Sequence, residues 1–232
     1  GIKGICQTLQ LTFGLVYEGW MKKKLRDIMQ RDDDKATVKL RDRVLKEGRV
    51  LPNDIIDVSA FMDSKVDVNL MDDCAKELSN RLGITRPTKI LTVATTGLII
   101  AIPMAKYLQV PVVYARKERN NVMSDTWQAS YSSDTVGKSG ELIVSKEHID
   151  PNDRIIVIDD FLSSGSSQEA LLRIVLDSGA EVVGVGVLLE KVYDSGRRAL
   201  AGFDVPIESL VRVASVSGGV IRLIEEDGFS GM

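Results

Sequence analysis

The chain has 232 residues, of which 44% are hydrophobic and 27% are charged, as is usual for a globular protein. Its formal net charge of −3 argues against a protein that binds nucleic acid over a broad basic face. One histidine and two cysteines exclude a multi-histidine metal centre and a disulfide framework, and they predict free thiols in a reducing compartment, the cytoplasm.

Residues 1–47 are predicted to be an N-terminal extension that is partly helical. Polar residues interrupt the apolar run in 1–20, so we expect neither a signal peptide nor a membrane span there, and Met21 would suit a natural start. A charged stretch with a narrow apolar stripe predicts a helix that ends at Gly48. The apolar side chains of that stripe are Val38, Leu40, Val44 and Leu45.

Residues 48–228 are predicted to form one α/β domain, with a mostly parallel sheet flanked by helices. Near-continuous apolar strands alternate with helices, which indicates a sheet covered on both faces. Residues 49–63 should be irregular or short-stranded, and residues 207–226 could add two strands around a turn at Gly218–Gly219. The expected helices are 68–82, 98–108 and 167–179, and the expected strands lie in 89–97, 110–117, 141–145, 154–160 and 180–191.

Ligands of an open parallel sheet bind at the carboxyl ends of its strands. The loops at 94–97, 117–140 and 159–167 should therefore surround a site, and 191–197 is a further candidate. Residues 118–140 are long and polar, with room for one more strand around "WQASYS".

The stretch "IIVIDDFLSSGSSQEAL" (155–171) leads an apolar strand into two adjacent acids, a loop of small residues and a helix. Backbone N–H groups of such a loop and the positive end of the helix make a phosphate cradle. Asp159 and Asp160 would repel a phosphate but can accept hydrogen bonds from vicinal hydroxyls. A ribose 5-phosphate offers both features. The alternative is that one aspartate caps the next turn and the other is solvated.

This stretch resembles the phosphoribosyl pyrophosphate signature of the type I phosphoribosyltransferase family, and the resemblance extends over about 45–225. It is greatest to the xanthine phosphoribosyltransferases, through "IDDFL" (158–162), "GVGVLLEK" (184–191) and Gly196–Arg197. The family implies that a purine base displaces magnesium pyrophosphate from phosphoribosyl pyrophosphate and yields a nucleoside monophosphate in purine salvage. Mg²⁺ is carried by the pyrophosphate, and the protein would be a homodimer.

The resemblance also implies a role for each matching position. Asp159 and Asp160 would hold the ribose hydroxyls and act in catalysis with Lys117, which would face pyrophosphate together with Arg116. A basic residue at that place often reaches across a dimer interface, and 118–140 would be a mobile lid. The 5-phosphate would be held by Ser163, Ser164, Gly165, Ser166 and Ser167, and pyrophosphate by Thr95, Thr96 and Gly97, unless the latter form an ordinary β–α turn.

The base would lie under a small hood subdomain at about 49–66, where Ile56 and Asp63 align with base-contacting positions. Lys191 would face the oxygen-bearing edge of a 6-oxopurine, xanthine being favoured; the alternative is a solvated lysine at a strand end. Ser163 replaces an acid usual in hypoxanthine-guanine relatives, which favours the xanthine and adenine branches. Two other departures are Ala94, where many relatives have a carboxylate, and Asp63, where an asparagine is frequent.

A competing interpretation is a purine regulator that senses phosphoribosyl pyrophosphate without catalysis. Such repressors share the fold and a similar "TVAT" loop, and they carry a DNA-binding module before it. The residues before the hood show no convincing pair of helices with a recognition surface, and Lys191 favours base binding. We therefore expect an enzyme; a scaffold that lacks both roles is a third interpretation.

Overall fold

The computed structural model describes residues 36–121, 123–133 and 138–224. Most of the predicted extension, 1–35, lies outside the described residues. Residues 36–47 are helical, as predicted. The buried stripe differs from the expected one: Leu40 and Val44 are buried, whereas Val38 and Leu45 are 52% and 54% exposed. Ala36 completes the buried stripe, because residues four apart lie on one side of a helix.

The centre of the molecule is a six-stranded sheet in the order β10-β9-β8-β7-β3-β4. Every neighbouring pair is parallel except β9 and β10, which form an antiparallel hairpin at the predicted glycine turn. The α/β class and the mostly parallel sheet are thereby confirmed. The strands are β3 (Lys89–Val93), β4 (Val112–Ala115), β7 (Arg154–Leu162), β8 (Glu181–Lys191), β9 (Ile207–Ser217) and β10 (Val220–Leu223).

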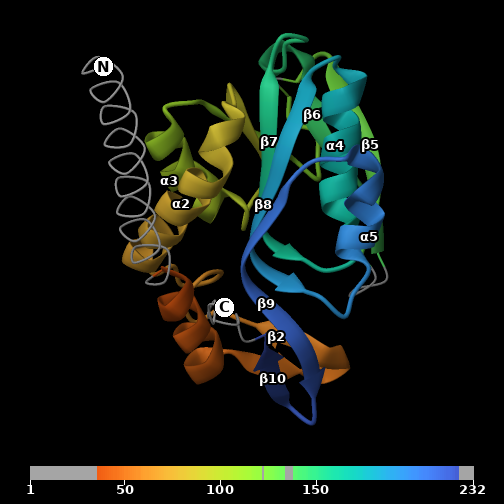
Figure 1. Ribbon diagram of the computed structural model, residues 1–232. Coiled ribbons are helices and arrows are strands. Elements are labelled where there is room, and N and C mark those ends of the chain that lie inside the picture. The colour runs from red at the N-terminus through yellow and green to blue at the C-terminus, as the bar shows by residue number, and fades with distance from the viewer. Residues whose placement is uncertain (1–35, 122, 134–137, 225–232) are drawn as a thin grey trace, which may run out of the picture.

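Helices cover both faces of this sheet (Figure 1). Side chains alternate along the central strand: Ile156 and Ile158 enter the hydrophobic cluster under α2 and α3, and Ile155 and Val157 enter the cluster under α4. Two cores result, one on each face of the sheet. The helices are α2 (Val68–Leu82), α3 (Leu98–Leu108), α4 (Ser166–Asp177) and α5 (Gly196–Leu200), and short 3₁₀ turns are η2 (Gly83–Thr85), η3 (Lys146–His148) and η4 (Ala201–Phe203).

The polar segment at 118–140 contains the further strand that was expected around "WQASYS". β5 (Thr126–Ser133) pairs antiparallel with β6 (Lys138–Ser145), which starts earlier than predicted. The side chains that pack against the cluster on the α4 face are Trp127, Ala129 and Tyr131. Since the residues between them are polar, only every second position carries an apolar signal, and the segment looks hydrophilic as a whole.

The hood forms a lower lobe beside the far end of β9 (Figure 1). Its short antiparallel strands are β1 (Arg49–Leu51) and β2 (Ile55–Asp57), joined by the turn η1 (Pro52–Asp54). Phe61 and Met62 of the hood share one hydrophobic cluster with Leu40 and Leu78. Hence the helix at 36–47, the hood and α2 pack together. No helix among the described residues is long and apolar enough to cross a bilayer.

Candidate functional site

The site lies where the strand order reverses. From β3 the chain continues outward to β4 on one side, whereas β7, β8 and β9 follow on the other. Loops that leave β3 and β7 therefore diverge and leave a crevice at the carboxyl edge of the sheet, the usual ligand position in such folds. These are the loops at 94–97 and 159–167.

A cavity of about 540 Å³, here called the acid-pair cavity, occupies this crevice. It brings together most of the predicted site residues from the β3 loop, the end of β4, β7, α4 and the hood. The predicted residues that line it are Asp63, Thr95, Thr96, Lys117, Asp159, Asp160, Ser163, Ser164, Gly165, Ser166 and Ser167. Four others do not line it: Ile56, Gly97, Arg116 and Lys191.

The phosphate loop (163–167) depends on a glycine. Gly165 has φ +83°, a left-handed conformation that a side chain disfavours, and it precedes the first turn of α4. A Cβ added there would lie 3.0 Å from the carbonyl oxygen of Gly196. A Cβ added at Gly196 would in turn lie 2.6 Å from the carbonyl oxygen of Ser163. The start of α5 thus supports the phosphate loop through backbone contact, which explains the glycine of the Gly196–Arg197 pair.

The two acids at the end of β7 differ in their surroundings. Asp159 is buried, and its Oδ1 accepts a 3.0 Å hydrogen bond from the Asp160 N–H. Its Oδ2 accepts a 2.7 Å bond from Nε2 of Gln168. Asp160 is half-buried, and its Oδ1 accepts a bond from the Phe161 N–H. Burial raises the pKa of Asp159 well above its ordinary value, the charge of Asp160 adds to this, and the charge of Lys117 opposes it.

Lys117 and the β5–β6 hairpin close one side of the cavity. The Lys117 ammonium lies 5.6 Å from the centre of the Tyr131 ring. The backbone N–H of Ser132, which also lines the cavity, donates a 2.7 Å hydrogen bond to Oγ of Ser166. The hairpin therefore touches the phosphate loop directly. Ser132 was not among the predicted site residues, because nothing in the local sequence marks a serine as the point of contact.

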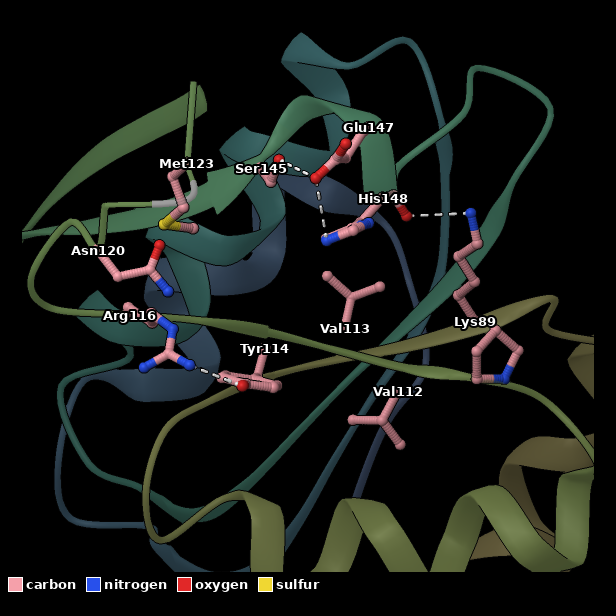
Figure 2. A pocket seen from close by; sticks show the side chains of 11 residues that line it. Lys89, Val112, Val113, Tyr114, Arg116, Asn120, Met123, Ser145, Glu147 and His148 are labelled. Atoms are coloured by element: carbon pink, nitrogen blue, oxygen red, sulfur yellow. Dashed lines mark hydrogen bonds and ion pairs between the residues drawn. The ribbon is translucent and has the colours of Figure 1, made fainter. Parts of the chain in front are cut away.

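Arg116 points elsewhere. It lines a second cavity of about 540 Å³ along the outer edge of β4, where its Nη2 donates a 2.7 Å hydrogen bond to the Tyr114 hydroxyl (Figure 2). Its backbone pairs with Ile143 of β6 through two 2.9 Å bonds. Consecutive side chains of an extended segment face opposite ways, so Arg116 and Lys117 cannot both face the acid pair of their own chain.

The remaining predicted residues, Lys191, Ile56 and Gly97, do not line the acid-pair cavity. Lys191 is half-buried at the end of β8. Burial lowers the pKa of its ammonium group, and the charges of Asp194 and of Asp54 in the hood, which act to raise that pKa, only partly offset the effect. Ile56 is 7% exposed and belongs to the hydrophobic core. A Cβ added at Gly97 would lie 3.0 Å from Oδ1 of Asp159, so Gly97 lets the β3 loop approach the acid.

The described residues contain no group of three or more His, Cys, Asp or Glu side chains arranged to hold a metal ion.

Comparisons with known proteins agree with the resemblance in sequence. Residues 64–201 match the phosphoribosyl transferase domain family. The chain is 34% identical to a xanthine phosphoribosyltransferase of Bacillus mycoides, over 81% of this chain and 96% of that protein. It is 35% identical to one of Moorella thermoacetica, over 80% and 95%. The fold matches adenine phosphoribosyl transferase of Trypanosoma brucei with a TM-score of 0.64 at 23% identity, covering 75% of this chain and 79% of that one.

Proposed function

The chain belongs to the phosphoribosyl transferase domain family, and from that premise we propose that it transfers the 5-phosphoribosyl group of phosphoribosyl pyrophosphate to a 6-oxopurine, with xanthine favoured. The observation that carries this is the acid-pair cavity. A phosphate loop, two carboxylates and Lys117 converge on one space from separate elements. The products are the nucleoside monophosphate and pyrophosphate, which makes this a purine salvage enzyme.

The donor substrate fits the cavity in one direction. The N–H groups and hydroxyls of the phosphate loop take the 5-phosphate, and the positive end of α4 favours its charge. The acid pair then receives the ribose hydroxyls. Thr95 and Thr96, on the opposite wall, offer hydroxyl and N–H donors to the magnesium-bound pyrophosphate.

In the reaction a ring nitrogen of the base loses its proton to solvent and forms a bond to C1 of the ribose, while the C1–O bond to pyrophosphate breaks and its electron pair leaves with the pyrophosphate. The protein positions the two substrates and stabilises the developing charges, so it needs no covalent nucleophile. Lys117 lines the cavity, its charge acts on Asp159, and it balances charge on the leaving group.

The base subsite lies between the hood and the end of β8. Lys191 offers hydrogen-bond donors there, which suit a purine carbonyl and not adenine. The charge of Asp54 reaches Lys191 across this space. Asp63 lines the adjoining wall. The relatives named xanthine phosphoribosyltransferase support the same choice of base.

The protein acts as a homodimer in the cytoplasm. Arg116 faces away from the acid pair of its own chain, so its guanidinium is available to a second copy. Sedimentation velocity should show a dimer. Mixing an inactive Arg116→Ala variant with an inactive Asp160→Asn variant should restore activity if the arginine acts on the partner's site, whereas a strictly monomeric active enzyme would contradict the dimer.

The decisive assay measures pyrophosphate release with phosphoribosyl pyrophosphate, Mg²⁺ and each of xanthine, guanine, hypoxanthine and adenine. We expect turnover with the oxopurines, fastest with xanthine. Binding of phosphoribosyl pyrophosphate without turnover of any base would instead support a regulator, in line with Ala94 in place of the usual carboxylate.

A further inference from the structure

Gln168 is a buried polar side chain to which the family resemblance assigns no role. It lies in the first turn of α4, is 3% exposed, and lines the floor of the acid-pair cavity. A glutamine is rarely buried to this extent unless its amide is satisfied. The hydrogen-bond partners of its amide therefore indicate its role.

One atom of Gln168 connects two segments. Nε2 donates a 2.7 Å hydrogen bond to Oδ2 of Asp159 and a 2.9 Å bond to the carbonyl oxygen of Phe161. Both partners are acceptors, so only the NH₂ end of the amide can face them. The amide thus joins the end of β7 to the start of α4 and spans the phosphate loop between them.

These contacts fix the orientation of one member of the acid pair, Asp159. With Oδ1 of Asp159 held by the Asp160 N–H and Oδ2 held by Gln168, the carboxylate has a single orientation. The Asp160 carboxylate, by contrast, accepts a 2.9 Å hydrogen bond at Oδ1 from the Phe161 N–H. The carboxylate of Asp159 is buried, and a donor beside it stabilises its charged form.

We propose that Gln168 is a positioning residue whose side-chain amide orients the Asp159 carboxylate, and with it the phosphate loop, for the sugar of the donor substrate. This rests on the proposed function, because the sugar is that of phosphoribosyl pyrophosphate. Burial and the charge of Asp160 raise the pKa of Asp159, whereas a hydrogen-bond donor at Oδ2 favours its ionised form. The charged groups that act on Asp159 are Asp160 and Lys117.

The test uses Gln168→Met, which keeps the length of the side chain and removes the donor. We expect kcat/KM for phosphoribosyl pyrophosphate to fall about 10- to 100-fold at neutral pH, the usual effect of losing a hydrogen bond to a charged group. The KM for the base should change little. The acid limb of the pH profile should move to higher pH, because Asp159 loses a group that favours its ionised form, so raising the pH should recover part of the activity.

A second variant and a control distinguish an effect on the orientation of the Asp159 carboxylate from an effect on the stability of the fold. In Gln168→Glu a protonated carboxyl can still donate, but the ionised one repels Asp159, so activity should fall as the pH rises. Ser178→Ala removes another buried hydrogen bond of the α4 region, from its Oγ to the Val175 carbonyl, far along the helix from the acids. It should lower thermal stability without moving the pH profile. Circular dichroism checks folding of each variant.

A Gln168→Met enzyme that loses the same factor at every pH, or none, would overturn the proposal. If the wild-type protein turns over no base, the proposed function fails instead. Calorimetric binding of magnesium phosphoribosyl pyrophosphate then still tests Gln168, with weaker binding and the same pH shift expected for the methionine variant and unchanged binding as the overturning result.

Discussion

Glu190 and Arg197 form a two-point ion pair between the end of β8 and the start of α5. Nε of Arg197 lies 2.6 Å from Oε1 of Glu190, and Nη2 lies 2.9 Å from Oε2. The Ser209 hydroxyl donates a further 2.6 Å bond to the same carboxylate, which is almost fully buried. Two segments that match the xanthine phosphoribosyltransferases, the end of β8 and the Gly196–Arg197 pair, are therefore one structural unit.

Arg197→Ala should lower the free energy of unfolding by about 1–3 kcal/mol, since it leaves a buried acceptor with fewer partners. Arg173→Ala is the control: its ion pair with Glu169 is exposed and one helical turn apart, a contact worth about 0.3–0.5 kcal/mol. Urea denaturation measures both. Equal losses in the two variants would contradict a special role for the buried pair.

The same contact predicts a pH dependence. Burial raises the pKa of Glu190, but the bonds from Arg197 and Ser209 and the charges of Arg197 and Arg212 outweigh it, so the pKa is lowered. A lowered pKa stabilises the fold above the unfolded-state pKa, and that stabilisation is lost as the pH falls through the folded-state pKa. The stability difference between wild type and Arg197→Ala should therefore shrink in acid, and a difference independent of pH would count against this account.

Replacing both acids, Asp159→Asn with Asp160→Asn, should abolish turnover while the protein stays folded. Each lost charge-assisted hydrogen bond to a ribose hydroxyl costs about 1.5–3 kcal/mol of binding. Asp177→Asn, at the far end of α4, is a control that should retain activity. Steady-state kinetics and circular dichroism are sufficient, and near-normal activity of the double variant would remove the acids from the site.

Gly165→Ala should raise the KM for phosphoribosyl pyrophosphate strongly. The left-handed backbone costs a residue with a side chain about 1–2 kcal/mol, and the new Cβ would press on the backbone of Gly196. Gly202→Ala is the matched control, because a Cβ there meets no atom within 4 Å. If both substitutions leave the KM unchanged, the phosphate loop does not bind the 5-phosphate.

Two lysines that lie over aromatic rings of β5 allow a matched comparison. Lys117 lies over Tyr131 at the acid-pair cavity, and Lys146 lies 4.6 Å from the Trp127 ring centre outside it. Each contact is worth about 0.5–1 kcal/mol at an exposed site, so the two alanine variants should lose similar stability. Only Lys117→Ala should lower kcat. A similar kcat in both variants would exclude Lys117 from catalysis.

Lys191→Ala should raise the KM for an oxopurine far more than that for phosphoribosyl pyrophosphate, because a buried donor then no longer meets the purine carbonyl. Unchanged base affinity, or adenine as the best base, would mean that Lys191 is a solvated strand end.

Asp63→Asn should alter the preference among xanthine, guanine and hypoxanthine, since an amide can donate where an ionised carboxylate cannot. Competition assays with the three bases measure the ranking. An unchanged ranking would place Asp63 outside the base subsite.

Hydrogen exchange tests the lid. The amides of β5, including that of Ser132 at the phosphate loop, should become more protected when magnesium phosphoribosyl pyrophosphate binds, because the hairpin already contacts Ser166. Equal protection with and without the ligand would mean that the hairpin is a fixed wall.

The amino-acid sequence by itself determined the alternation of strands and helices and the unit of strand, acid pair, small-residue loop and helix in 155–171. These are local features, set by side-chain periodicity and by the backbone freedom of Ser and Gly. The predicted bounds of α2 and α3 were met for the same reason, and β5 includes the further strand predicted around "WQASYS". The start of β6 was placed too late, because Ser139 and Gly140 carry no apolar signal.

Only the tertiary structure decided how residues distant in the chain combine. It separated Arg116 from Lys117, brought Asp63 from the hood to the acid-pair cavity, and left Ile56 in the core. It also revealed that Gln168, an ordinary helix residue by its local context, holds Asp159. Such contacts depend on how strands and helices pack, and no short-range pattern of residue types encodes the direction of one buried amide.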